Sequence, residues 1–147
     1  MPRNPRQCPP GLPVHVIQRG NNRQVCFASD SDMKAYANWL LDAAAKYDVA
    51  IHAWVFMTNH VHLLLTPTSP NAISRCMQYL GRYYVRYFNY RYKRTGTLFE
   101  GRFKSNVVQN QKYLLAQSLR YCPPRTWRLW CSWFSQGGGS TNRFFWP

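Results

Sequence analysis

The sequence is short of acidic residues: five Asp and Glu stand against 19 Lys and Arg, for a formal net charge of +14 over 147 residues. No apolar run approaches the roughly 20 residues of a membrane-spanning helix, and residues 1–6 lack the apolar stretch of a secretory signal. The five cysteines form no Cys-x-x-Cys pair, and their odd number argues against a disulfide framework. We therefore expect a cytoplasmic protein without membrane contact, whose polyanionic partner is nucleic acid.

Hydrophobic patterns predict a single α+β domain. The expected strands cover about residues 14–19, 49–57, 60–66 and 103–108, and the expected helices cover about 31–47, 71–93 and a segment from about 110. We expect the 49–57 strand to be buried on both faces and to form a hairpin with the next strand. The order resembles a ferredoxin-like plait, an antiparallel sheet with βαββαβ order, followed by a C-terminal helix.

His60 and His62 are separated by one residue in the third expected strand. Alternate side chains of a strand leave the same face, so both imidazoles should project together while Val61, Leu63 and Leu65 point into the core. Two imidazoles on one rigid face can hold a metal ion, although a third ligand must come from elsewhere. The alternative is a half-buried strand that carries two histidines by chance.

The expected helix over 71–93 has two unlike faces. Its core stripe consists of Ile73, Met77, Leu80, Tyr84 and Phe88. The other face carries cations interleaved with phenol rings, at Arg75, Tyr79, Arg82, Arg86, Tyr90 and Lys93. Cations contact phosphates and aromatic rings stack on unpaired bases, so the pattern favours single-stranded nucleic acid over a merely solvated basic face.

The helix expected from residue 110 places Tyr113, Gln117 and Tyr121 at intervals of four residues, hence on one face. Without a further signal, the sequence favours an ordinary amphipathic aromatic at a helix end for Tyr121 over a nucleophile. Glu100 stands among cations, and we favour a structural partnership with Arg over a role as a catalytic acid.

Four ordered segments carry a family resemblance: residues 16–23, 59–64, 96–105 and 113–121. They resemble the REP-associated tyrosine transposases, relatives of the single-tyrosine HUH transposases, over about residues 1–121. The resemblance implies a nuclease and strand transferase that acts on single-stranded hairpins of repetitive extragenic palindromes through a 5′-phosphotyrosine intermediate. It also implies His60 and His62 as metal ligands, Tyr121 as nucleophile, Mg²⁺ or Mn²⁺ as cofactor and a monomeric state.

The sequence departs from this family pattern directly after Tyr121. Arg125 stands where the pattern has an amide that resembles the third metal ligand of related enzymes, and a cation cannot ligate a metal. Gln117, one turn before Tyr121, is the alternative amide ligand. Two consecutive prolines should end the helix, which leaves 122–147 as an irregular, tryptophan-rich tail. Our hypothesis for this tail is a frame-shifted or recombined end.

Three functions fit these observations. The first is a metal-dependent tyrosine transposase, and the second is a decayed family member that binds DNA hairpins without cutting them. The third, a hydrolase that uses His60 and His62 to activate water, is less favoured because the sequence has few acids and no third His or Cys at a plausible spacing. The expected DNA contacts are Arg19, Arg23, Arg82, Arg86, Arg91, Lys93, Arg94, Arg102 and Lys104.

Overall fold

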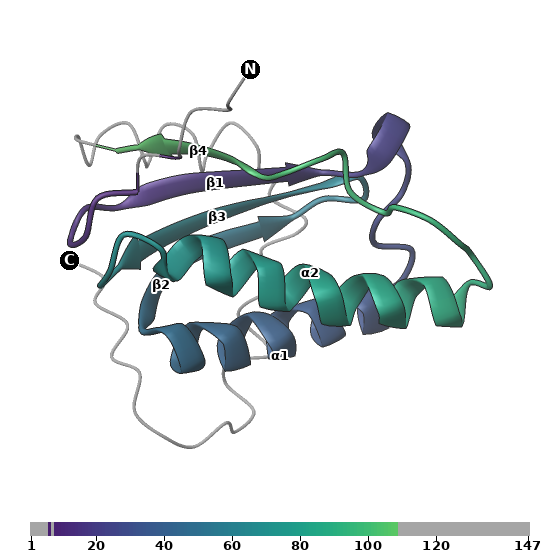
Figure 1. The fold of residues 1–147 in the computed structure, drawn as a ribbon. Helices are drawn as coiled ribbons and strands as arrows, with labels where there is room; N and C mark the ends of the chain where they lie inside the picture. The colour runs from purple at the N-terminus through teal and green to yellow at the C-terminus, as the bar shows by residue number, and fades with distance from the viewer. Residues whose placement is uncertain (1–5, 7, 109–147) are drawn as a thin grey trace. The chain divides into compact units, whose positions relative to one another are not determined.

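The computed structural model describes residues 6 and 8–108. Its strands are β1 (Val14–Arg19), β2 (Val49–Phe56), β3 (His60–Pro67) and β4 (Lys104–Val107); its helices are α1 (Asp30–Tyr47) and α2 (Ala72–Arg91). A short 3-10 turn, Asn21–Arg23, follows β1. The four strands form one sheet in the order β2-β3-β1-β4, with every pairing antiparallel. Both helices lie on the same face of this sheet (Figure 1).

This arrangement confirms the predicted α+β class and, within the described ranges, the βαββαβ order of a ferredoxin-like plait. The predicted hairpin between the second and third strands is also confirmed. The helix expected from residue 110, the boundary expected after residue 121 and the irregular tail all lie outside the described residues.

The core lies between the sheet and the two helices. Val61, Leu63 and Leu65 are at most 1% exposed, as the alternation of the third strand predicts. The predicted stripe of α2, from Ile73 to Phe88, is buried along its whole length. Among the described residues, the helices cover one face of the sheet, and the other face, called the open face below, carries no helix.

The prediction that the second strand is buried on both faces is wrong. In the described part of the sheet β2 is an edge strand, and Ala50 and His52 are exposed. The register shifts between Ile51 and Ala53, so that His52 is an extra residue opposite β3. This bulge interrupts the simple alternation of buried and exposed residues along β2. The apolar sequence of β2 therefore resembles that of a central strand, although β2 is an edge strand.

Two further expectations concern membranes and thiols. Within residues 6 and 8–108, no helix is long and apolar enough to cross a membrane. Cys8, Cys26 and Cys76 are free and buried. These thiols behave as small apolar core residues.

Candidate active site and nucleic-acid interface

The open face of the sheet holds the two histidines of the third strand. His60 and His62 alternate with the buried Val61 and Leu63, so they project away from the helices. Their ring centroids are 4.9 Å apart, with ring planes inclined at 75°. The structure thus brings the two imidazoles together, as their spacing predicts.

Each of these rings has a neighbouring side chain at Nδ1. Nδ1 of His60 lies 2.6 Å from Oδ1 of Asn59, and Nδ1 of His62 lies 3.0 Å from Nε2 of His15. Histidines that bind metal commonly use one ring nitrogen to fix their orientation in this way. Each imidazole of the pair therefore has a side chain at Nδ1 that can orient it, as metal-binding histidines commonly do.

Strand β1 supplies the residues beside the pair. In the antiparallel register Arg19 lies opposite His60, and Ile17 lies opposite His62. His15, two residues before Ile17, shares its face and is the diagonal neighbour of His62. Sequence reasoning did not single out His15: the alternation of β1 places it on the polar face, but nothing in the sequence states which strand lies next to it.

The surroundings keep these imidazoles neutral. Burial, with the nearby charge of Arg19, lowers the pKa of His60. Burial, followed by the effects of His15, His60 and Arg19, lowers the pKa of His62 to about 4, and burial lowers the pKa of His15. Neutral imidazole is the form that coordinates a metal ion, so the site is already in the required protonation state at neutral pH.

A metal ion fits the two imidazoles as part of its ligand set. Among residues 6 and 8–108, no group of three or more His, Cys, Asp or Glu side chains could hold a metal ion. A site on His60 and His62 therefore needs a further ligand of another type or from another part of the chain. Gln117, the predicted amide ligand, and Tyr121, the predicted nucleophile, both lie outside the described residues.

Three of the four segments that carry the family resemblance meet at Gly20, at the end of β1. The Gly20 amide donates to the Asn59 carbonyl, and the Asn21 amide donates to the Leu98 carbonyl. The Glu100 amide donates to the carbonyl of Arg19. A Cβ at position 20 would overlap the Gln24 carbonyl oxygen, so only glycine allows this close approach. These backbone contacts place Arg19 beside the histidines.

The predicted DNA contacts fall into separate groups. Lys104 pairs with Ile17 from the other side of β1, so Arg19 and Lys104 both lie on the open face, on the β1 side of the histidines. The other predicted contacts with exposed side chains are Arg82, Arg86 and Arg91 on α2, Lys93 after it, Arg23 in the 3-10 turn and Arg102 before β4. Arg94 is partly buried and donates to Oε1 of Gln24 at 2.6 Å. The structure therefore brings only some of the predicted contacts close to His60 and His62.

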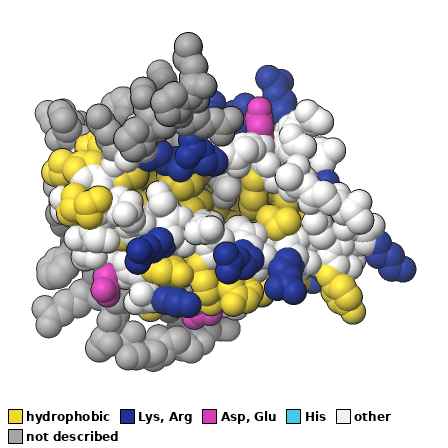
Figure 2. Space-filling model, in the orientation of Figure 1, with side chains coloured by type: hydrophobic (Ala, Val, Ile, Leu, Met, Phe, Trp, Pro, Cys, Tyr) yellow, Lys and Arg dark blue, Asp and Glu magenta, His cyan; other side chains and the backbone are white. Residues whose placement is uncertain are grey.

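The exposed side of α2 combines cations with aromatic rings. Tyr90 is 90% exposed and Tyr83 is 41% exposed. Lys46 of α1 lies over the Tyr79 ring, 5.0 Å from its centroid. Figure 2 shows Lys and Arg side chains over this helix with hydrophobic side chains between them. This surface faces away from the sheet, so it lies on the layer opposite the histidines.

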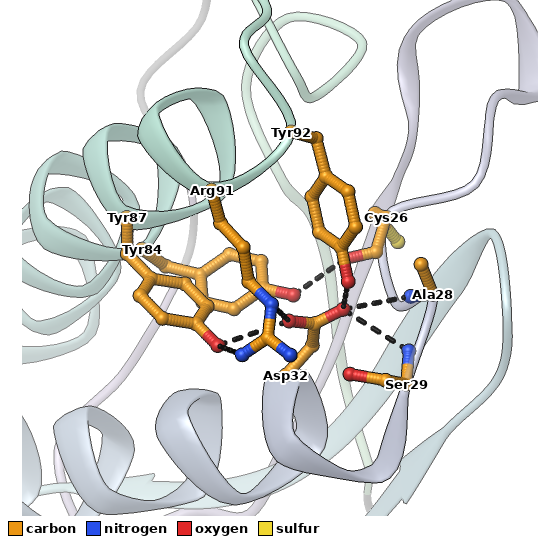
Figure 3. A network of polar contacts seen from close by, with 8 residues as sticks. All are labelled: Cys26, Ala28, Ser29, Asp32, Tyr84, Tyr87, Arg91 and Tyr92. Carbon is orange, nitrogen blue, oxygen red and sulfur yellow. Dashed lines mark hydrogen bonds and ion pairs between the residues drawn. The ribbon is translucent and has the colours of Figure 1, made fainter.

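Arg91 differs from its neighbours because it joins a buried polar network (Figure 3). Asp32 is completely buried and accepts hydrogen bonds from the Tyr87 and Tyr92 hydroxyls at 3.0 and 2.6 Å. Nε of Arg91 lies 3.8 Å from the same carboxylate, and this guanidinium also donates to the Tyr87 hydroxyl. The network joins the start of α1 to the end of α2. Arg91 as a DNA contact remains a prediction.

Solved structures with this fold include two transposases. A REP-associated tyrosine transposase bound to a REP hairpin matches with a TM-score of 0.64 and 14% identity, over 80% of this chain and 68% of that chain. A candidate transposase from Deinococcus radiodurans R1 matches with a TM-score of 0.56 and 21% identity, over 81% of this chain and 95% of that chain. At these identities the likeness establishes a common fold.

The family is established by sequence. A comparison with curated protein sequences finds no match. The family model described as "Transposase IS200 like", however, matches residues 10–119. The matched range contains His60, His62 and Gln117, and it ends two residues before Tyr121. The transposase resemblance of the sequence motifs is therefore confirmed at this level, and the chain belongs to the IS200-like transposase family.

Proposed function

We propose that this protein is a metal-dependent transposase that cleaves and rejoins single-stranded DNA hairpins of the REP type. The observation that carries the proposal is the pair His60 and His62 on the open face of the sheet, with Arg19 opposite His60. Neutral imidazoles and an adjacent guanidinium suit a scissile phosphate and its metal ion. The fold shared with a transposase bound to a REP hairpin supports the choice of DNA.

The roles of the side chains follow from this arrangement. His60 and His62 would hold Mg²⁺ or Mn²⁺, with Gln117 as the proposed third ligand; when bound, the ion would neutralise charge on the scissile phosphate. Arg19 and Lys104 would bind phosphate oxygens on the β1 side of the histidines. The cations then fix the DNA strand, and the histidines fix the position of the ion.

Tyr121 is the proposed nucleophile. Its phenol oxygen would attack phosphorus and lose its proton, the bond to the 3′ oxygen would break, and that oxygen would leave as a 3′-hydroxyl after gaining a proton. The product is a 5′-phosphotyrosine. Attack on it by another 3′-hydroxyl reverses the step and joins strands without a nucleotide cofactor, because the phosphodiester bond energy is retained.

The remaining cations would bind DNA away from the histidines. Arg82 and Arg86 would contact phosphates along α2, with the exposed Tyr83 and Tyr90 available for base stacking. Arg23, Lys93, Arg94 and Arg102 belong to the same proposed set. We propose that one copy of the chain in the cytoplasm is sufficient for binding.

One observation favours a second function, which is hairpin binding without cleavage. Arg125 occupies the position at which the family pattern has an amide ligand, and the sequence of 122–147 departs from that pattern. Without a third ligand the metal ion would bind weakly and the tyrosine would be a poor nucleophile. The proposed DNA contacts all lie within the described residues, so this second function requires no role for Arg125.

Incubation of the full chain and its Tyr121→Phe variant with labelled hairpin DNA and Mn²⁺ separates these functions. A covalent adduct on a denaturing gel that is absent with Tyr121→Phe would establish the transposase chemistry. Hairpin binding with no adduct would leave the DNA-binding function. Cleavage by the Tyr121→Phe variant would instead indicate water activation and overturn the proposed nucleophile.

A further inference from the structure

We propose that His15 is a positioning residue that fixes the ring of His62 for metal binding, by accepting a hydrogen bond from its Nδ1–H. The inference rests on the proposed function for the metal ion itself. Nothing in the His-x-His spacing points to His15, because it lies on another strand. It would act through His62 and would not coordinate the ion.

The geometry of the two rings carries the argument. Nε2 of His15 lies 3.0 Å from Nδ1 of His62, and the ring planes differ by only 13°. The ring centroids are 5.2 Å apart, which exceeds the nitrogen separation by about two ring radii. The rings therefore lie edge to edge in nearly one plane. This is the arrangement of an in-plane N–H to N hydrogen bond, in contrast to face-to-face stacking.

The direction of this hydrogen bond decides what His62 can do. A neutral imidazole has one protonated nitrogen and one acceptor nitrogen. If His15 donated to Nδ1, His62 would carry its own proton on Nε2 and could not coordinate through that atom. If His62 donates from Nδ1, its Nε2 is the nitrogen with a lone pair. Metal binding at Nε2 therefore requires His15 to be the acceptor.

His60 provides an internal parallel. Its Nδ1 lies 2.6 Å from Oδ1 of Asn59, and an amide oxygen can only accept a hydrogen bond. Both histidines of the pair would then donate from Nδ1 to a side chain and present Nε2. The acceptor for His60 comes from the adjacent residue, and the acceptor for His62 comes from the paired strand β1.

Substitution of His15 in the full chain tests the proposal through Mn²⁺ binding, measured by calorimetry or electron paramagnetic resonance without DNA. His15→Leu removes the acceptor, and we expect it to weaken Mn²⁺ binding by about 10- to 100-fold. His15→Gln retains a side-chain acceptor near the position of Nε2, and we expect binding within about threefold of the unmodified protein. Equal binding by the Leu variant would overturn the proposal, as would equal loss in both variants.

A matched control separates this role from a general effect of histidine loss. His52 lies on the edge strand β2, and its ring contacts the Thr66 hydroxyl at 2.6 Å and not the histidine pair. We expect His52→Leu to leave Mn²⁺ binding unchanged. A loss as large as that of His15→Leu would mean that any open-face histidine matters, which contradicts a specific role for His15.

The tautomer of His62 provides a second readout that needs neither metal nor DNA. Long-range ¹H–¹⁵N spectra of the histidine rings should show the proton on Nδ1 in the unmodified protein and in His15→Gln, and a tautomer mixture in His15→Leu. A proton on Nε2 of His62 in the unmodified protein would overturn the inference even if Mn²⁺ binding were too weak to measure. This outcome is independent of the adduct assay, so the proposed function and the role of His15 can fail separately.

Discussion

The two layers of this domain present different kinds of surface. On the open sheet face, the histidines lie on paired antiparallel strands, and their ring nitrogens contact neighbouring side chains. On the helical layer, Arg82, Arg86 and Tyr90 are exposed side chains of a single helix. A rigid face suits chemistry that needs fixed distances, whereas long exposed cations suit contact with a flexible polyanion. We infer that the sheet face, with Arg19 and Lys104 beside the histidines, serves cleavage, and that α2 on the other layer mainly adds affinity for DNA.

The largest expected effect comes from the loss of a proposed metal ligand on the sheet face. His62→Ala removes one proposed metal ligand, so we expect adduct formation with hairpin DNA and Mn²⁺ to fall by at least about 100-fold. Hairpin affinity should change by less than about twofold, because the cations remain. A gel assay for the adduct and a binding titration check both parts. Loss of affinity as large as the loss of cleavage would break the division between layers.

The next effect concerns the stability of the helical layer. Asp32→Ala leaves the Ala28 and Ser29 amides and two hydroxyls without their acceptor, and we expect the free energy of unfolding to fall by about 3 kcal/mol. Asp30→Ala, an exposed acid in the same first helical turn, should lower it by less than about 1 kcal/mol. Urea unfolding measures both, and equal losses would show that the network contributes nothing beyond helix charge.

The contribution of Asp32 should also depend on pH. Burial raises its pKa, but hydrogen bonds from Tyr92, Ala28, Tyr87 and Ser29 outweigh that effect and leave the pKa below its usual range. The carboxylate therefore stabilises the fold fully above its unfolded-state pKa of about 3.9, and this contribution is lost as the pH falls through the folded-state value. The stability difference between the unmodified protein and Asp32→Asn should be larger at pH 7 than at pH 3. A constant difference would contradict this account.

A smaller effect tests the affinity layer. The double replacement of Arg82 and Arg86 by Ala should weaken hairpin binding by about tenfold near 0.1 M salt and lower the log–log salt slope by about two units. Adduct formation at saturating protein should stay within about twofold of the unmodified chain. Arg75→Gln, at an exposed position of the same helix, is the control. It shows how much the loss of one charge alone changes hairpin binding and its salt slope. An unchanged slope in the double variant would remove α2 from the interface.

The smallest effect is a gain in stability within α2. A Cβ at Gly81 would meet no atom within 4 Å, and the residue lies inside the helix. Gly81→Ala should raise the free energy of unfolding by roughly 0.5–1 kcal/mol through helix propensity. Thermal or urea unfolding measures the change, and adduct formation should be unaffected. A reduction in stability would show that α2 needs the flexibility of glycine at this point.

The sequence allowed much of the fold to be predicted because periodic patterns are local. The spacing of Ile73 to Phe88 predicted the buried side of α2, and the alternation around His60 and His62 predicted their shared face; the structure confirms both. The partners of these residues could not be predicted. His15 reaches His62 only through strand pairing, and Arg91 reaches Asp32 only through the packing of α2 on α1.

The bulge at His52 and the glycine at position 20 also depend on contacts that exist only in the folded chain. Sequence reasoning treated residues 49–57 as a regular strand, because an inserted residue is visible only when its partner strand is known. The resemblance marked residues 16–23 as a motif without a reason for Gly20. That reason is the nearby Gln24 carbonyl, which belongs to the folded chain.

The pairing of β1 with β3 has a consequence for how such a site persists while sequences diverge. A slip of one residue would turn His15 and Arg19 toward the helices and expose Val14 and Val16, which are completely buried. Burial of the hydrophobic side of β1 therefore also fixes the register of its polar side. Selection that preserves only the hydrophobic face of β1 would therefore also preserve the positions of the histidines, even if it did not act on DNA binding.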